Sequence, residues 1–174
     1  NGATTQDITN LSALTYTVTV TDSSGCTATL KALITQPGTL SVIIGTVTNT
    51  TCNGANTGAI AINVSGGTQP YTFVWSNGAT TQDITNLSAL TYTVTVTDSN
   101  GCTATLSQLI TQPGTLSVII GTVTNTTCNG ANTGAIAINV SGGTQPYTFV
   151  WSNGATTQDI TNLSALTYTV TVTD

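Results

Sequence analysis

The side chains that could carry catalysis are scarce in this chain. Its 174 residues include six acidic residues, all of them aspartate, one basic residue, Lys31, and no histidine, glutamate or arginine. General acid–base catalysis relies mostly on histidine, carboxylates, lysine, tyrosine or cysteine. A serine or threonine hydroxyl without a positioned base is inert. We therefore expect no enzymatic activity and no cofactor in this segment.

The four cysteines, Cys26, Cys52, Cys102 and Cys128, superimpose in pairs when the sequence is shifted by 76 residues. Such constant positions favour a disulfide framework in an oxidising, extracytoplasmic setting. A zinc site is not expected, because the chain has neither histidine nor a C-x-x-C pair. Pairing Cys52 with Cys102 would close a loop of about 50 residues and staple each repeat for roughly 4 kcal/mol. That pairing is our prediction, with Cys26 and Cys128 bonded outside the sequence; the alternative, Cys26 with Cys52, would join successive repeats.

The stretch Asp98–Gly101, "DSNG", combines oxygen donors with a glycine. Clustered oxygens suit a hard cation such as calcium. Asp, Asn and Gly at these positions are also the residues of a tight turn, in which the side chains bond the backbone and glycine takes a positive φ. Because Asp83 is the only other carboxylate between residues 38 and 113, we predict a turn and no metal site.

The elements that position these residues recur along the chain. Residues 1–98 align with residues 77–174 with only three differences: Ser24/Asn100, Lys31/Ser107 and Ala32/Gln108. Pro-Gly pairs, which break secondary structure, occur at Pro37-Gly38 and Pro113-Gly114. We therefore predict the C-terminal half of a truncated repeat at 1–37, a complete repeat at 38–113 and the N-terminal part of a third, truncated repeat at 114–174.

Within the complete repeat, apolar and polar residues alternate with a period of two, which is typical of half-buried strands. This alternation assigns to the core the residues Ile60, Ile62, Val64, Tyr71, Phe73, Trp75, Tyr92, Val94 and Val96. Strands are expected at Thr39–Thr48, Gly58–Val64, Tyr71–Gly78, Thr80–Ile84, Thr91–Asp98 and Cys102–Ile110. The aromatic row from Tyr71 to Trp75 could instead stack on sugars, but its spacing on a central strand favours the core.

Six or seven short strands separated by turns, with one tryptophan on the third, fit an immunoglobulin-like sandwich. The leucine-rich corner before Tyr92, with Leu87 and Leu90, resembles the tyrosine corner of such folds. The expected fold class is therefore all-β, with tandem immunoglobulin-like β-sandwich domains of six to seven strands each. The longest apolar run, Leu40–Ile44, is far shorter than the roughly 20 residues that cross a bilayer, so no membrane insertion is expected.

The residues of one repeat also carry a family resemblance. The pattern "C-N-G-x-N-x-G-x-I-x-x-x-V-x-G-G-x-x-P-Y-x-F-x-W-S-N-G-A-T-T-Q", followed by "TYTVTVTDSNGC" and "ITQP", is similar to the SprB-type repeat. Repeats of this type occur in very long secreted adhesins of gliding and related Bacteroidetes. The resemblance implies a secreted protein at the cell surface or outside the cell, with a role in adhesion, motility or matrix.

Composition and repetition indicate the kind of partner. Nucleic acid is not expected, because phosphate binding requires clustered Lys or Arg. Identical domains joined by short linkers form a quasi-one-dimensional array, and sheet edges without charge do little to prevent association. We expect the shaft of an extracellular filament that self-associates through neighbouring repeats or other copies of the chain. The alternative is the repeat region of a surface adhesin that binds polysaccharide or takes part in gliding motility.

Overall fold

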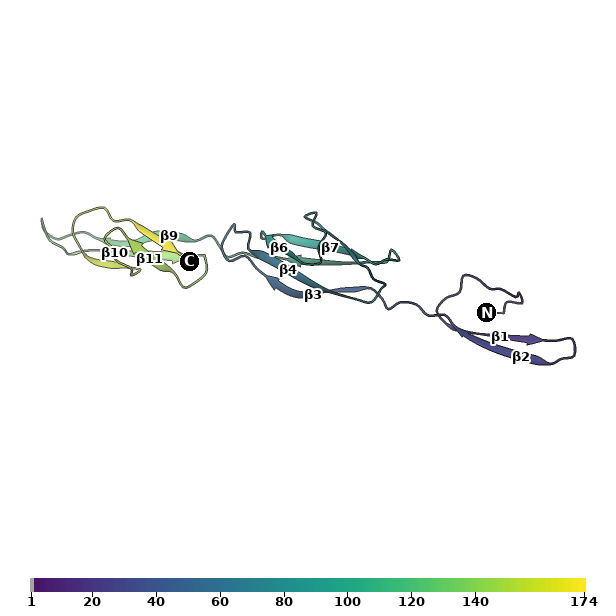
Figure 1. Cartoon of the computed structure of the whole chain (residues 1–174). Coiled ribbons are helices and arrows are strands. Elements are labelled where there is room, and N and C mark those ends of the chain that lie inside the picture. The colour runs from purple at the N-terminus through teal and green to yellow at the C-terminus, as the bar shows by residue number, and fades with distance from the viewer. Residues whose placement is uncertain (1) are drawn as a thin grey trace.

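The computed structural model describes residues 2–174, and within this range the chain consists of strands and loops without a helix (Figure 1). This confirms the all-β class. Accordingly, no helix in the described range is long and apolar enough to span a membrane. The strands are β1 (Thr15–Thr21), β2 (Thr27–Leu33), β3 (Ser41–Thr48), β4 (Gly58–Ser65), β5 (Thr72–Trp75), β6 (Ile84–Leu87), β7 (Thr91–Thr97), β8 (Thr103–Leu109), β9 (Ser117–Thr124), β10 (Gly134–Ser141), β11 (Thr148–Trp151), β12 (Ile160–Leu163) and β13 (Val170–Thr173).

The middle repeat is a sandwich of two three-stranded antiparallel sheets. One sheet has the order β3-β4-β6 and the other β5-β7-β8. The same division places strands A, B and E of an immunoglobulin domain opposite strands C, F and G. Strand D has no counterpart here, because β5 is followed directly by β6 in the first sheet. The expected sandwich architecture, with six strands in this repeat, is therefore confirmed.

Strand β7 shows how the alternating sequence produces the sandwich. Tyr92, Val94 and Val96 are buried, whereas the threonines between them are only half-buried. Val94 lies opposite Trp75 of β5 in the strand register. Because successive side chains of a strand point to opposite faces, one face of β7 closes the interior and the other is left with hydroxyl groups.

The core of the middle repeat is continuous between the two sheets. Of the residues assigned to it from the sequence, Ile60, Ile62, Trp75, Tyr92, Val94 and Val96 are buried. Val64, Tyr71 and Phe73 are half-buried and pack against this cluster. The structure adds Val42, Ile84, Leu87 and Ile110, of which Ile110 is fully buried.

The sixth strand, β6, begins later than the sequence predicts. A strand was expected at Thr80–Ile84, but the structure places it at Ile84–Leu87. The residues before Ile84 bond to Trp75 instead. The backbone N–H of Trp75 donates to Ala79 O at 2.9 Å, and its indole Nε1 donates to Thr81 O at 2.9 Å. These two bonds engage carbonyls that a sheet neighbour would otherwise bind, so pairing with β4 starts only at Ile84.

The corner before β7 has the geometry of a tyrosine corner. The hydroxyl of Tyr92 donates to the carbonyl of Ser88, four residues upstream, at 3.3 Å. The same bond occurs from Tyr168 to Ser164 in the third repeat. This feature is characteristic of immunoglobulin-like sandwiches and agrees with the expected resemblance.

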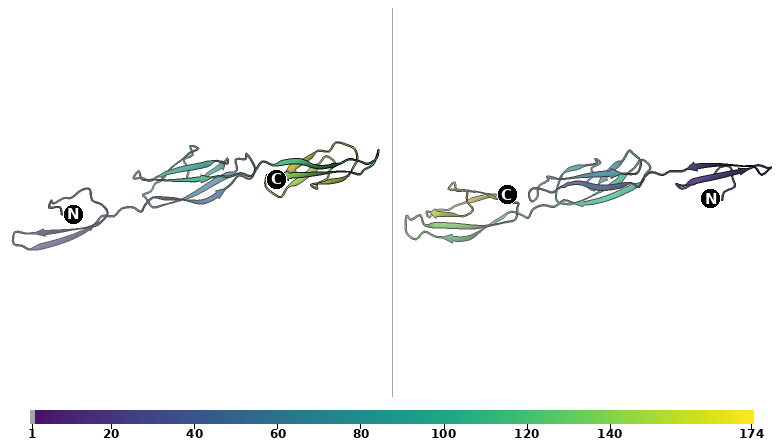
Figure 2. Two further views of the ribbon diagram at one scale, coloured as in Figure 1. Left: turned by 180° about the vertical axis from the view of Figure 1, so that it is seen from behind. Right: turned by 90° about the horizontal axis from the view of Figure 1, so that it is seen from below.

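The outer repeats contribute fewer strands over the described residues. Residues after Pro113 form the sheets β9-β10-β12 and β11-β13 around a second core that contains Trp151, and residues before Pro37 form the hairpin β1-β2. The three units follow one another along one line, each joined to the next by a single extended segment (Figures 1 and 2). Each repeat therefore extends the chain lengthwise.

Candidate functional site: the junction between repeats

The cysteines do not form the predicted intradomain bridge. All four are exposed free thiols in the structure. Cys52 follows β3 in a loop that contacts the exit from β8: Asn53 Nδ2 donates to Pro113 O at 3.0 Å, and Gly54 N donates to Gln112 Oε1 at 2.9 Å. Cys102, in contrast, directly precedes the first residue of β8.

The length of β8 explains why the prediction is wrong. A strand of seven residues separates Cys102 from the end of the domain where Cys52 lies, which is about 24 Å at 3.4 Å per residue. A disulfide requires Cα atoms within about 7 Å. The alternative of Cys26 with Cys52 is no closer, because Cys26 lies in the β1–β2 turn, far from the connection to the middle repeat (Figure 1).

The aromatic row does not form a stacking platform in solvent. Trp75 is only 3% exposed, and its Nε1–H bonds the chain at Thr81. The hydroxyl of Tyr71 donates to Gly66 O, and Phe73 packs against the core. The expected assignment to the core fits these contacts better than a sugar-binding face.

The Asp98–Gly101 stretch forms the tight turn between β7 and β8. One carboxylate oxygen of Asp98 accepts the N–H groups of Asn100 and Cys102 at 2.9 Å, and the other accepts that of Thr68 at 2.9 Å. Gly101 takes a φ of 82°. Within residues 2–174, no group of three or more His, Cys, Asp or Glu side chains is placed to hold a metal.

The environment of Asp98 favours its charged form. Burial acts to raise the pKa of this carboxyl, but the backbone N–H groups of Thr68, Cys102, Asn100 and Gly101 lower it, and the net pKa lies below its ordinary value. Hydrogen bonds to a carboxylate stabilise its charged form and so depress the pKa. The carboxylate thus holds together the turn at the end of the domain that meets the preceding repeat.

The linker that enters each repeat lies against a glycine loop. Gly38 O accepts the N–H of Gly67 at 2.7 Å, and the corresponding bond joins Gly114 and Gly143 at 2.8 Å. At Gly66, with a φ of 69°, a Cβ atom would lie 2.0 Å from Thr39 O. Only glycine allows the loop and the incoming chain to approach so closely.

The linker that leaves the middle repeat is held as tightly. Asn49 Oδ1 accepts the N–H of Thr111 at 2.9 Å, and Thr111 O accepts the N–H of Thr50 at 3.1 Å. The bonds from Asn53 and Gly54 to Pro113 and Gln112 continue this series towards the junction. Backbone or side-chain hydrogen bonds therefore hold Thr111, Gln112 and Pro113 against the repeat that they leave.

One contact crosses the junction directly. Thr144 Oγ1 of the third repeat donates to Thr51 O of the middle repeat at 3.5 Å. The sequence analysis did not predict this interface. One signal was present, because the polar "NTTCNG" stretch and the "ITQP" stretch each recur at the same position in successive repeats. Their proximity depends on strand pairing between segments about 60 residues apart, which periodicity within a strand does not reveal.

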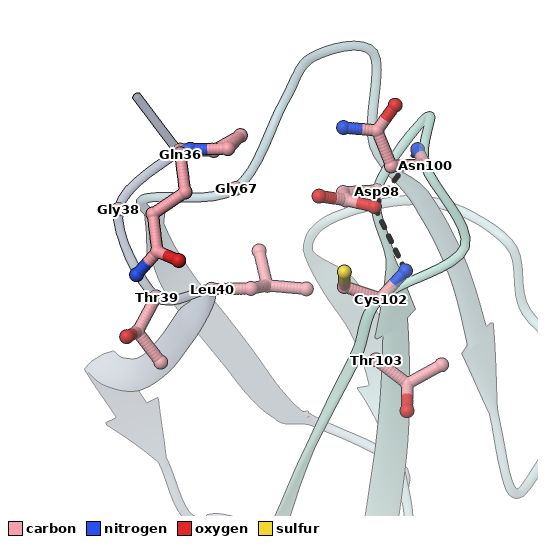
Figure 3. Close-up of a pocket in the computed structure, with 10 residues that line it drawn as sticks. Gln36, Gly38, Thr39, Leu40, Gly67, Asp98, Asn100, Cys102 and Thr103 are labelled. Carbon is pink, nitrogen blue, oxygen red and sulfur yellow. Dashed lines mark hydrogen bonds between the residues drawn. The ribbon is translucent and has the colours of Figure 1, made fainter. Parts of the chain in front are cut away.

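A groove lies at the other end of the middle repeat, where the first linker enters. It has a volume of about 320 Å³, and its lining includes Gln36 and Leu40 from the linker side and Asp98 and Cys102 from the turn. Figure 3 shows Gln36 and the turn residues on opposite sides of the open space, with the side chain of Leu40 extending between them towards Cys102. The turn that holds Cys102 therefore faces the end of the preceding repeat.

The comparison with protein families agrees with these repeats. The SprB repeat model matches residues 44–80 and again residues 120–156, which confirms the resemblance to this family. No curated protein matches the chain in sequence. Both matches start within the first strand of a sandwich and run past its tryptophan, so the middle and third units each contain a region that matches the SprB repeat model.

Proposed function

We propose that this chain forms part of the shaft of an extracellular filament built from tandem immunoglobulin-like repeats. The observation that carries the proposal is the junction, in which the linker is hydrogen-bonded to the repeat it leaves and to the repeat it enters. A linker without such bonds would behave as a flexible tether. A linker held on both sides transmits the direction of one domain to the next.

The dimensions of one repeat suit an extended shaft. Its longest strands have eight residues and span about 27 Å. The turns and the linker add further length, up to about 3.4 Å for each extended residue. The rise per repeat is then about 35 Å. Because the repeats follow one another in line (Figure 2), the length increases with their number.

The surface supports association of this shaft with other copies of the chain. Several large apolar side chains of the middle repeat are exposed, among them Ile43 at 58%, Val74 at 60% and Leu109 at 53%. Lys31 is the only basic residue, so little charge repels a neighbouring sheet edge. A contact between two such chains would recur at every repeat, and contacts of this kind propagate into fibres.

Small-angle X-ray scattering on the purified chain tests the stiffness of the shaft. The matched control has five Gly/Ser residues inserted between Pro113 and Gly114, which separates the two sets of linker bonds without changing either sandwich. We expect a rod-like profile for the natural chain and a broader distribution of maximum dimensions for the control. Equal distributions for the two proteins would refute the stiff junction.

Negative-stain microscopy over a range of concentrations tests the lateral association. Bundled or helical filaments are the expected result. Single rods at every concentration would exclude self-association and leave a shaft made of one chain.

A second candidate function is the repeat region of a surface adhesin that binds polysaccharide or serves gliding motility. The SprB match supports it, since SprB repeats occur in cell-surface proteins. The same match supports a location at the cell surface or outside the cell. Because Trp75 is buried, we expect blue-shifted tryptophan emission that added polysaccharide leaves unchanged, so binding must be measured directly on immobilised glycans.

A further inference from the structure

The incoming and outgoing linkers of the middle repeat attach to two strands that run in the same direction. The incoming linker leads into β3, and the outgoing linker follows β8. Ser41 at the start of β3 lies opposite Ser65, and Thr103 at the start of β8 lies opposite Thr97. Ser65 and Thr97 lie at one end of the sandwich, because the loop after the first is hydrogen-bonded to the turn after the second. Both strands therefore start at this end and finish at the opposite one.

Tension along the array pulls β3 and β8 in opposite directions, each along its own axis. The units follow one another in line (Figure 1), so the force enters the middle repeat at Gly38 and leaves it at Pro113. β3 then has to slide along β4, and β8 along β7, with all bonds of each ladder loaded together. Bonds that share a load in this way break at a higher force than bonds that are opened one after another.

Three residues connect the two loaded strands directly at the end where both finish. Asn49 and Thr50 follow β3, and Thr111 follows β8. Thr50 N donates to Thr111 O at 3.1 Å, and Thr111 N donates to Asn49 Oδ1 at 2.9 Å. Thr50 is only 4% exposed, so its bond lies in a low-dielectric environment, where a hydrogen bond is stronger than in water. We propose that Asn49, Thr50 and Thr111 form a mechanical clamp, which keeps the repeat folded under tension along the array.

The clamp lies on the shortest path of the force through the repeat. Force that enters at the start of β3 reaches Thr50 along the extended strand and passes from there to Thr111 and the outgoing linker. The outgoing segment is also fixed to the other sheet, because Ile110 N donates to Leu90 O, directly before β7, at 2.9 Å. Rupture of the clamp is therefore the first step of unfolding under tension.

The clamp rests on the proposed shaft only for the source of the tension. Its test uses single molecules and does not require a filament. A repeat without the clamp could still form rods in scattering and microscopy, and a repeat with the clamp could fail to form them. The failure of one proposal is therefore distinguishable from the failure of the other.

The exposed cysteines are attachment points for pulling single molecules in two directions. In the first variant, Cys52→Ser and Cys102→Ser leave Cys26 and Cys128 as the handles, so the middle repeat is pulled from opposite ends, as in the array. In the second variant, Cys52→Ser and Cys128→Ser leave Cys26 and Cys102. Gly38 and Cys102 line one groove at the same end of the repeat. The repeat then turns across the force, and β3 and β8 are peeled apart from that end.

The length released identifies the middle repeat in both experiments. β2 and, in the first variant, β9 lie between a handle and a linker, and both are already extended strands. Unfolding of the middle repeat lengthens the tether by about 200 Å, at about 3.4 Å for each residue that becomes extended. The rates are compared at one constant force, because forced unfolding is governed by the unfolding rate constant.

We expect slower unfolding at a given force when the handles are Cys26 and Cys128. In this direction, Asn49→Ala should raise the unfolding rate roughly fivefold, the effect of losing one hydrogen bond of average strength. Asn49→Asp, which keeps an acceptor oxygen, should retain the slow rate. With Cys26 and Cys102 as handles, neither substitution should change the rate, because peeling starts at the end far from the clamp.

Two results would overturn the clamp. One is an equal unfolding rate in the two directions for the chain with Asn49, which decides the question even if Asn49→Ala does not fold. The other is an equal effect of Asn49→Ala in both directions, which would mean that Asn49 stabilises the fold in general and does not resist tension along the array.

Discussion

Replacement of Ile110 tests whether the middle repeat closes its own interior just before the linker. Ile110 directly follows β8, is fully buried and packs closely under β4: a Cβ on Gly58 would lie 2.9 Å from its Cγ2 atom. Its counterpart in the first repeat, Ile34, precedes the same Thr-Gln-Pro sequence but is 37% exposed. The pair Ile110→Ala and Ile34→Ala therefore makes one chemical change in two environments.

The expected cost follows from the atoms removed. Isoleucine to alanine deletes three carbon groups at about 0.8 kcal/mol each, or about 2.4 kcal/mol of transfer free energy. The cavity left between the sheets raises the loss of unfolding free energy to about 3–4 kcal/mol, within the range for such buried sites. For Ile34→Ala we expect less than about 0.5 kcal/mol, as for other exposed positions.

Urea unfolding followed by tryptophan fluorescence measures this difference. The chain has only two tryptophans, so Trp151→Phe as a common background makes Trp75 the reporter of the middle repeat. If Ile110→Ala prevents folding, Ile110→Val should still fold with a loss of about 1 kcal/mol. Equal midpoints for Ile110→Ala and Ile34→Ala would refute the assignment of Ile110 to the core of the middle repeat.

Two further predictions concern the end of the domain that meets the preceding repeat. Because the pKa of Asp98 lies below its ordinary value of 3.8 in the folded state, its carboxylate stabilises the fold above that pH, and this contribution is lost as the pH falls through the folded pKa. Asp98→Asn should therefore show a smaller decrease in its urea midpoint than the natural chain between about pH 6 and pH 3; equal decreases would contradict the role of this carboxylate. Gly66→Ala should destabilise the repeat more than Gly78→Ala in thermal unfolding. Both glycines have positive φ, so an alanine at either position should cost about 1–2 kcal/mol of backbone strain. Only at Gly66 would the added Cβ also meet a backbone oxygen, that of Thr39, at 2.0 Å, whereas Gly78 has open space. Equal losses of stability for the two variants would count against the close approach of the linker.

The sequence alone determined the features that depend on neighbouring residues. The period of two along β7 identified Tyr92, Val94 and Val96 as one face, because side-chain direction along a strand alternates regardless of what the strand pairs with. The Asp98–Gly101 turn was likewise predictable, since the bonds from Asn100 N and Cys102 N to the Asp98 carboxylate join residues within four positions of each other. The family resemblance followed from the same local pattern.

Only the tertiary structure decided which distant residues meet. Whether Cys52 lies near Cys102 depends on the direction of β8 and on the end of the domain that each loop occupies, and strand alternation contains no information on either. The start of β6 likewise depended on the carbonyls engaged by Trp75. The junction itself arises because strand pairing brings Asn49 and Thr111, 62 positions apart, into one hydrogen bond, and such pairings are set by the closure of the whole sandwich.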